Sequence, residues 1–146
     1  MLALIQRVTQ ARVDVAGETV GAIGPGLLAF VGIQPDDEEP QIARMTTRLL
    51  GYRVFADGQG RMNRSLADCT GDLLLISQFT LAADTASGMR AGFSTAAAPP
   101  VAEPLFAKLV ERCRQQHAGR VEIGRFGAHM TVSLVNDGPV TFLLRA

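Results

Sequence analysis

Residues 132–146, VSLVNDGPVTFLLRA, place two apolar, strand-like runs on either side of Asn136–Pro139. Asn-Asp-Gly alone predicts a tight turn between two strands. Pro139 removes a backbone donor where the second run begins, and a sheet tolerates proline there mainly at an edge. An X-Pro bond can be cis at a cost of only about 0.5–1 kcal/mol. A cis Gly138–Pro139 bond would turn two carbonyl oxygens to one side, where they could hold an ammonium group.

The rest of the chain alternates turn signals with short apolar runs that are typical of strands. A helix is expected in residues 34–52, capped by Asp36 or Asp37, because acidic residues and Pro40 lie where a first turn favours them. A second helix is expected at 103–116, with an apolar stripe at Leu105, Leu109 and Cys113. Strands are expected at 2–8, in a hairpin within 11–24, and at 27–33, 52–57, 72–81, 120–126, 129–135 and 140–145, with a long loop at 82–100.

These expected elements number about eight strands and two helices, and the strands come as hairpins rather than in strict alternation with helices. The pattern favours a mixed α/β fold in which curved, partly barrel-like mixed or antiparallel sheets pack against two α-helices. A chain of 146 residues is long enough to bury a core of its own. We therefore expect one domain spanning residues 1–146.

The composition, 47% apolar and 19% charged, is that of a soluble globular protein. The formal net charge is zero, which argues against general nucleic-acid binding because phosphate neutralisation drives that binding. We find no signal-peptide pattern and no apolar run of membrane-spanning length. A cytoplasmic protein is expected, with Cys69 and Cys113 as reduced thiols and not a disulfide.

Metal and phosphate motifs are weak. Cys113 and His117 stand four residues apart on the expected second helix, but no further ligand pattern accompanies them. A buried thiol near a surface histidine is the better interpretation. The glycine-rich stretch 21–26, GAIGPG, contains Pro25 and precedes no helix, so it predicts a turn and not a nucleotide loop.

Ser77 and Thr80 lie at the end of the most apolar expected strand, where sites of α/β proteins often form. A hydroxyl nucleophile requires a base within hydrogen-bond reach. His117 and His129 are the two imidazoles of the chain, and their spacing places neither beside Thr80. From spacing alone, the better interpretation is that both hydroxyls merely satisfy backbone groups at a strand end.

Four motifs can be combined: IQRV at 5–8, LGYRVF at 50–55, SQFTL at 77–81 and NDGPVT at 136–141. In this order and spacing the chain resembles, over nearly its whole length, the D-aminoacyl-tRNA deacylase family, also called D-tyrosyl-tRNA deacylases. The resemblance implies hydrolysis of the ester between a D-amino acid and the tRNA 3′ adenosine, removal of glycine mischarged on tRNA-Ala, and rejection of L-aminoacyl-tRNA. It also implies a homodimer with the active site at the interface, and no metal or other cofactor.

The resemblance assigns roles residue by residue. It places Ser77, Gln78, Phe79 and Thr80 beside the ester, Gly138 and Pro139 in a loop inserted into the other subunit, Arg7 as the brace of that loop, and Phe126 and Met130 beside the terminal adenine.

The inserted loop would act as a backbone clamp on the α-ammonium of the substrate, so that an L side chain would collide with the clamp while a D side chain or glycine fits. For catalysis we expect the 2′-hydroxyl of the terminal ribose to position or activate water and backbone amides near Phe79 and Thr80 to stabilise the oxyanion. The Thr80 side chain would be supportive. The chain departs from the family pattern Arg-Pro-Ser-Phe at 90–93, where Ala91 and Gly92 replace proline and serine.

Three other hypotheses remain open at this point. The protein could be a dimeric module that binds nucleic acid or nucleotide without chemistry. It could be a general esterase that uses Thr80 or Ser77 and ignores chirality. Asn136–Pro139 could also be no more than a hairpin turn that supports a dimer.

Overall fold

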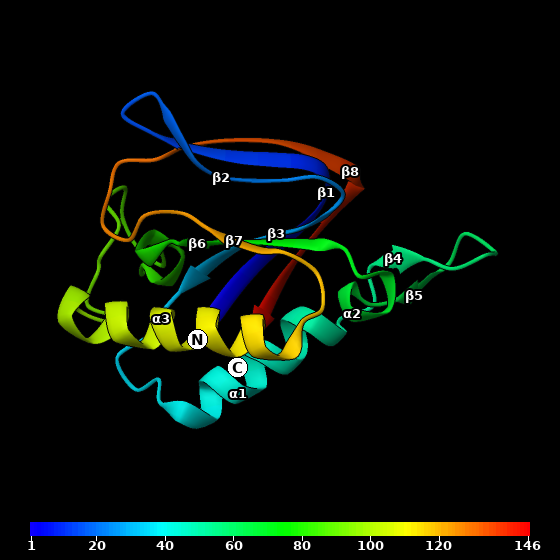
Figure 1. The fold of residues 1–146 in the computed structure, drawn as a ribbon. Coiled ribbons are helices and arrows are strands. Elements are labelled where there is room, and N and C mark those ends of the chain that lie inside the picture. Colours follow the sequence, from blue (N-terminus) through cyan, green and yellow to red (C-terminus); the bar gives the residue numbers. More distant parts are fainter.

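The computed structural model describes all residues from 1 to 146 and contains one large sheet, one small sheet and four helical segments (Figure 1). The strands are β1 (Leu2–Val15), β2 (Glu18–Ile23), β3 (Gly26–Gly32), β4 (Phe55–Ala56), β5 (Met62–Arg64), β6 (Asp72–Ser77), β7 (Val121–Ile123) and β8 (Thr131–Arg145). The helices are α1 (Glu39–Gly51), α2 (Leu66–Cys69), the 3-10 helix η1 (Phe79–Ala82) and α3 (Pro99–Gln116).

The large sheet runs in the order β2-β1-β3-β6-β7, with β8 paired to the other edge of β1. The first half of β1 pairs with β3 and the second half pairs with β2, while β8 follows β1 along nearly its whole length. Because both long strands bend, the sheet folds over itself into two layers (Figure 1). The mixed α/β fold with a curved, barrel-like sheet, as expected from the sequence, is confirmed.

Gly21 allows the sheet to close upon itself. A Cβ atom at this position would lie 2.6 Å from the carbonyl oxygen of Ile123 on β7. No side chain fits at that separation, so glycine lets the backbone of β2 approach β7 closely. This contact brings the two ends of the sheet together.

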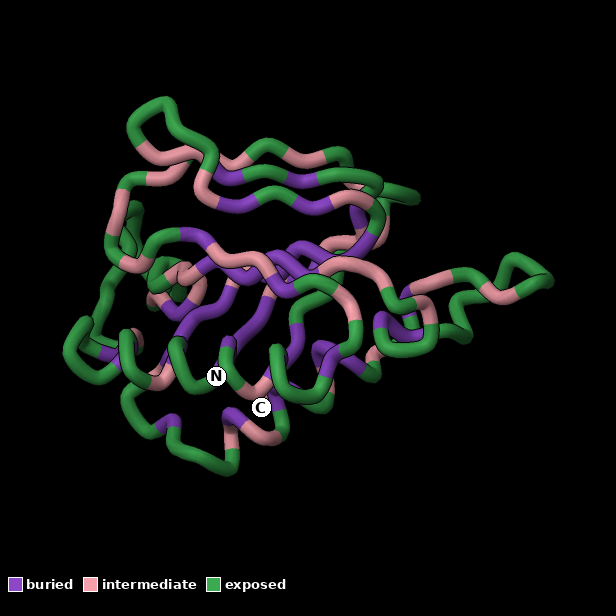
Figure 2. Tube along the Cα trace, viewed as in Figure 1, coloured by how far each residue is buried: buried purple, intermediate pink, exposed green.

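Two apolar clusters fill the molecule. The larger one lies between the sheet and helices α1 and α3, and it includes Leu27, Ala29 and Val31 from one face of β3. The smaller one lies between the two layers and includes Leu28 from the other face of β3. Figure 2 shows that the central strands are mostly buried and that the outer sides of the helices are exposed. Burial on both faces explains why β3 and β6 read as continuous apolar runs.

The two long helices differ from the sequence expectation at their starts. Glu38 caps α1, whereas Asp37, one of the expected caps, is buried and accepts hydrogen bonds from the Met1 ammonium and from the Gln34 amide. Helix α3 begins at Pro99, four residues before the expected start at 103, because proline is favoured in a first turn, where its missing donor has no partner to lose. Its buried stripe contains Leu109 and Cys113 as expected, but Leu105 is only partly buried.

Several strands are shorter than the sequence predicted, and the structure contains a short helix, α2, that was not predicted. The expected strand at 52–57 forms only β4, which pairs with β5 in a projecting hairpin, and the one at 120–126 forms only β7. The expected strand at 72–81 ends at Ser77, and η1 follows. The short helix α2 was not expected, although Ser65 caps it through a reciprocal pair of hydrogen bonds with Asp68. None of the helices combines the length and the apolar character needed to cross a lipid bilayer.

Candidate active site

Residues 136–141 form a bulged corner in β8 and not the expected hairpin turn. Asn136 pairs with Val8 and Thr141 pairs with Gln6, so Arg7 alone on β1 faces residues 137–140 on β8. Residues 137–140 are not paired with β1, and both strands bend at this point. A bend of this kind is the usual effect of a β-bulge. The two apolar runs are therefore one long strand. The Gly138–Pro139 peptide bond is cis.

Side chains close the corner at its base. The Asn136 amide donates a hydrogen bond to Thr141 Oγ1 (2.9 Å) and its oxygen accepts one from the Val140 backbone (3.2 Å). Asp137, Gly138 and Pro139 are exposed. This explains the Asn-Asp-Gly-Pro sequence locally: asparagine substitutes for lost ladder bonds, and Gly138 has a φ of +124°, a conformation that favours glycine.

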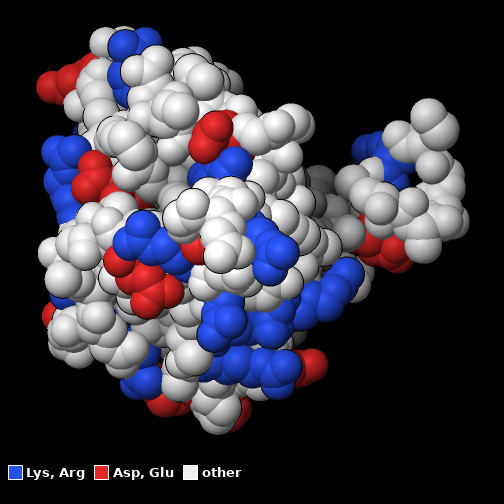
Figure 3. All heavy atoms as spheres, turned by 90° about the vertical axis from the view of Figure 1, so that its right-hand side faces the viewer, with Lys and Arg blue, Asp and Glu red and all other residues white.

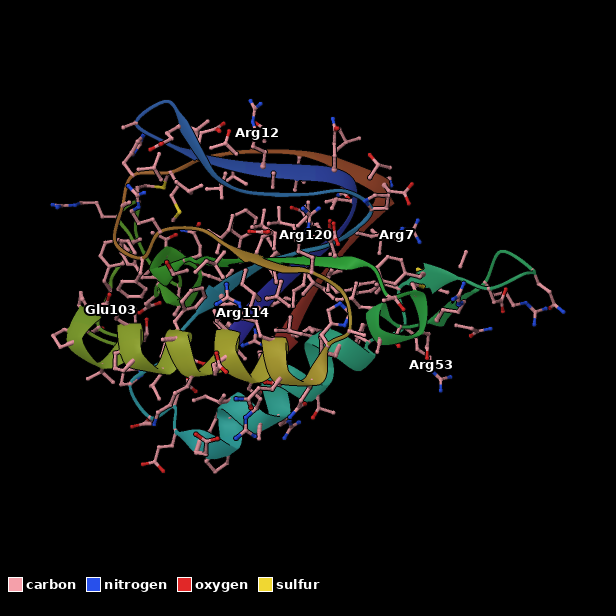
Figure 4. The ribbon with its side chains drawn as sticks, viewed as in Figure 1. Arg7, Arg12, Arg53, Glu103, Arg114 and Arg120 are labelled. Carbon is pink, nitrogen blue, oxygen red and sulfur yellow. The ribbon has the colours of Figure 1, made fainter.

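Arg7 holds the corner from below. Its Nε lies 2.9 Å from Asp137 Oδ2 and donates to the Asp137 carbonyl at 3.2 Å, while Nη1 donates to the Val54 carbonyl at 2.7 Å. The Arg7 side chain is 15% exposed, so these contacts are less screened by water than a surface ion pair. Figure 4 shows Arg7 at the end of the molecule where β8 bends. Figure 3 looks onto this end and shows Lys and Arg side chains mixed with acidic ones.

A cavity of about 710 Å³ lies at the opposite end of the sheet, beyond the carboxyl ends of β3 and β6. Most of the side chains around it are apolar. Its lining residues include Val31, Ile33, Ser77, Gln78, Phe79, Phe93, Ala97, Phe126, His129 and Met130. The volume and the apolar lining with a few polar groups are those of a small-molecule site.

Ser77, Gln78 and Phe79 of the SQFTL segment form one wall of this cavity, whereas Thr80 and Leu81 are not among its lining residues. The Gln78 backbone amide bonds to the Val31 carbonyl (2.7 Å), after which the chain leaves the sheet and turns through η1. Thr80 is exposed, and its Oγ1 accepts a hydrogen bond from the Gln78 side-chain amide. No imidazole or carboxylate is hydrogen-bonded to Thr80, so its hydroxyl lacks the base that a nucleophile requires.

The opposite wall comes from residues 126–130, between β7 and β8. Phe126 packs at 6.2 Å from Phe106 of α3, with the rings tilted by 44°. Met130 Sδ lies where a Cβ on Gly124 would approach to 2.7 Å, so the thioether packs directly over that glycine. Both residues are half-buried and line the cavity together with Gln78 and Phe79.

The residues expected in one site thus separate into two groups within one chain. Arg7 is paired with Leu27 on β3, whereas Ser77 is paired with Val31. Four steps along an extended strand span about 13 Å. The corner around Gly138 therefore lies at the other end of the sheet from the cavity, as Figure 1 shows for the bend of β8 and the end of β6.

No group of three His, Cys, Asp or Glu side chains is arranged to hold an ion. Cys113 is buried as expected, and burial raises the pKa of its thiol to about 11. His117 was expected at the surface, but it is also buried, with its Nε2 lying 2.7 Å from the Gly71 carbonyl. His129 and Phe93 line the cavity although no role was assigned to them from the sequence. Their places in two separate loops carry no local pattern that could have brought them together.

Known proteins resemble this chain over its full length. A family model described as D-Tyr-tRNA(Tyr) deacylase matches residues 4–145. The chain is 69% identical over 145 residues to a D-aminoacyl-tRNA deacylase of Stenotrophomonas maltophilia (strain K279a), and 68% identical to one of Xanthomonas campestris pv. campestris (strain 8004). Each alignment covers 99% of this chain and 99% of the relative.

Two solved structures share the fold. One, described as c-Myc DNA Unwinding Element Binding Protein, matches with a TM-score of 0.96 and 36% identity over 100% of this chain and 99% of that one. The other, described as a structural analysis of a probable eukaryotic D-amino acid tRNA deacylase, matches with a TM-score of 0.88 and 17% identity over 99% and 98% of the two chains, and it shows the fold alone. With the family match at residues 4–145 and relatives of 68–69% identity, this chain belongs to the D-Tyr-tRNA(Tyr) deacylase family.

Proposed function

We propose that the protein hydrolyses the ester bond of D-aminoacyl-tRNA and releases the free D-amino acid and tRNA. The observation that carries this proposal is the cavity at the ends of β3 and β6, one wall of which is formed by Ser77, Gln78 and Phe79 of the SQFTL motif. Relatives of 68–69% identity named D-aminoacyl-tRNA deacylase support the same reaction.

The active unit is a homodimer in which each subunit lends its corner to the cavity of the other. Two features support this arrangement. Gly138 and Pro139 are exposed and project from the edge strand β8, whereas the cavity lies at the other end of the same sheet. A corner therefore reaches a cavity only from a second copy, and two-fold symmetry makes the exchange reciprocal.

In this dimer, main-chain oxygens near Gly138 and Pro139 accept hydrogen bonds from the substrate's α-ammonium. An L side chain would then point into the backbone of the corner, while the D side chain points away from it. The selection works by steric exclusion and needs no contact with a particular side chain. Glycine has no side chain to exclude, so glycine mischarged on tRNA-Ala is also hydrolysed.

The chemical step is assisted by the substrate. The 2′-hydroxyl of the terminal ribose adjoins the ester and positions or activates the attacking water. Leading N–H groups of η1, near Phe79 and Thr80, have no partner within a helix turn and stabilise the developing oxyanion. Thr80, hydrogen-bonded to Gln78, orients this segment and forms no covalent intermediate.

A parallel deacylation assay on D-Tyr-tRNA and L-Tyr-tRNA tests the proposal directly. Purified protein should hydrolyse the D ester at least about 100-fold faster than the L ester, since a steric clash of about 3 kcal/mol suffices for such a ratio. Equal rates on both esters would exclude the clamp. The same assay on glycyl-tRNA(Ala) measures the activity on glycine.

A 2′-deoxy terminal adenosine tests the chemical step. Loss of the 2′-hydroxyl should lower kcat by about 100-fold or more, since a positioned proton-transfer group typically contributes about 100-fold to 10,000-fold. Unchanged turnover of the 2′-deoxy substrate would favour an enzyme-borne group. Hydrolysis of simple esters without a ribose would favour a general esterase.

A second candidate function is nucleic-acid binding without chemistry. The relative at 36% identity that is described as a DNA unwinding element binding protein favours it. Retained binding of tRNA or DNA, with no hydrolysis of either aminoacyl ester, would support this candidate over the deacylase.

A further inference from the structure

Two exposed aromatic rings stand at the mouth of the cavity. Phe79 is 58% exposed and Phe93 is 48% exposed, and both also line the cavity. Their ring centroids are 5.2 Å apart with the planes tilted by 56°. Large apolar side chains that contact each other and still face solvent beside a cavity mark a place where a partner group binds.

The segment that carries Phe93 is held in place by hydrogen bonds. Asp84 and Gly92 exchange two backbone bonds of 2.8 and 2.9 Å, and Thr95 Oγ1 donates to the Ala82 carbonyl at 2.6 Å. Farther along, the Ala97 amide bonds to the Ile33 carbonyl at 2.9 Å. The ring of Phe93 is therefore presented on an ordered loop, so a ligand does not have to order it on binding.

Two unpaired cations belong to the segments that line the cavity. Arg90 precedes Phe93 by three residues, and Arg125 adjoins Phe126. Both are exposed, and neither forms an ion pair, whereas Arg7, Arg12, Arg112 and Arg120 all do. Guanidinium groups without carboxylate partners are available for phosphate oxygens.

We propose that Phe79 and Phe93 form a stacking subsite for the nucleobase next to the terminal adenosine, with Arg90 and Arg125 contacting the phosphates of the same single strand. The subsite rests on the proposed function, which places the terminal adenosine inside the cavity and leaves the preceding nucleotide at its mouth. Aromatic faces that stack bases, flanked by cations that follow the backbone, are the general means of holding a single strand. The ligand class is a single-stranded oligonucleotide of at least two nucleotides, and stacking makes the subsite tolerant of base identity.

The test compares three D-tyrosyl esters that differ only in the nucleic acid: adenosine, the dinucleotide CpA and full-length tRNA. The wild-type protein should show a kcat/KM about 10-fold higher on the CpA ester than on the adenosine ester, the scale of one stacked base. Phe93→Leu removes the aromatic face but keeps an apolar side chain. The loss of kcat/KM, mainly through KM, should be about 10-fold larger on the CpA and tRNA esters than on the adenosine ester, where any loss reports only on the part of Phe93 that lines the cavity.

Met62→Ala serves as the matched control, because Met62 on β5 is 47% exposed, nearly the same as Phe93, and does not line the cavity. Arg125→Gln should reduce the slope of log affinity against log salt for tRNA by about 0.7, the value of one single-strand phosphate contact. Arg61→Gln, in the β4–β5 hairpin, should leave that slope unchanged.

If Phe93→Leu lowers kcat/KM equally on all three esters, or lowers it on none, the proposed stacking subsite is wrong. A loss accompanied by a weaker dimer would assign Phe93 to the subunit interface and would overturn it as well. Binding of uncharged CpA and adenosine, measured by calorimetry, separates this inference from the proposed function. If no ester is hydrolysed but Phe93→Leu weakens the binding of CpA and not of adenosine, the proposed deacylase function is wrong and the stacking subsite is supported.

Discussion

The cavity and the corner are opposite kinds of site within one chain. The cavity is concave, and side chains such as Phe126 and Met130 form its surface. The corner is convex and exposed, and it presents main chain at Gly138 that Arg7 secures from beneath. A surface made of side chains recognises a particular group, whereas a surface made of main chain excludes shapes whatever the side chain is.

This difference explains why the two regions depend on different parts of the sequence. The cavity requires the ends of β3 and β6 to be adjacent, which the core of both strands ensures. The corner requires one conformation of residues 137–140, which depends on a few specific contacts. We therefore expect substitutions at the corner to affect activity much more than stability.

The largest effect is expected for Gly138→Ala. The added Cβ would lie 2.7 Å from Val140 Cγ2 and 3.0 Å from Arg7 Nη2, at a φ of +124° that L side chains rarely adopt. Strain of about 1–3 kcal/mol would displace the corner, and the rate on D-Tyr-tRNA should fall by about 100-fold or more. Gly58→Ala is the control, because a Cβ there meets nothing within 4 Å.

Mixed dimers sharpen this prediction. Gly138→Ala subunits, with an intact cavity, are combined with Gln78→Ala/Phe79→Ala subunits, with an intact corner. If the corner acts across the interface, the mixture should recover activity that neither variant has alone. No recovery in verified mixed dimers would show that each subunit uses its own corner.

Arg7→Gln is expected to have the next largest effect. It removes the bonds to Asp137 and leaves the partly buried Val54 carbonyl without its donor, at a cost of about 1–3 kcal/mol of stability. The rate on D-Tyr-tRNA should fall by about 10-fold or more through a misplaced corner. Arg12→Gln breaks an exposed pair with Asp14 and should change neither Tm nor rate noticeably. A normal rate for Arg7→Gln would contradict the bracing role.

Thr80→Ala should have a smaller effect on the cavity side. The variant loses a hydroxyl that bonds only to Gln78, so kcat should fall by less than about 10-fold, the scale of one lost orienting hydrogen bond. Single-turnover kinetics give kcat independently of binding. Complete loss of turnover with retained substrate binding would instead make Thr80 the catalytic group.

The smallest effect is expected for Asp72→Asn, because the Asp72 side chain bonds to Gly24 and Arg120, which belong neither to the cavity lining nor to the corner. Burial, the largest single influence, raises the pKa of Asp72, but hydrogen bonds from Arg120 and from the Gly24 amide together outweigh it and lower the pKa below its ordinary 3.8. A lowered folded-state pKa adds stability above about pH 4, and that stability is lost as the pH falls through the folded pKa. At pH 7 the Tm of the variant should be about 2–4 °C below that of the wild type, with unchanged activity. This difference in Tm between the two proteins should shrink below pH 3.8. A constant difference at every pH would rule out the ionised carboxylate as its source.

Local patterns predicted some features well and others poorly, for identifiable reasons. Continuous apolar runs predicted β3 and β6, because their residues are buried on both faces. The end of β6 at Ser77 could not be predicted, since LISQFTL remains strand-like and only the bond from Gln78 to Val31 shows where the sheet ends. Asp37 is a good helix cap by type, but a buried contact with the Met1 ammonium engages it instead.

The sequence by itself determined the mixed fold, the apolar faces of α1 and α3 and, through its motifs, a set of candidate residues for the site, though not Phe93 or His129. These features depend on periodicity and residue type, which act over a few neighbouring positions. Only the tertiary structure decided that the two runs around Asn136–Pro139 are one bulged strand, that Phe93 joins Phe79 at the cavity, and that the corner lies at the far end of the sheet. Such placements depend on which strands pair and where they bend, and contacts between residues far apart in the chain set both.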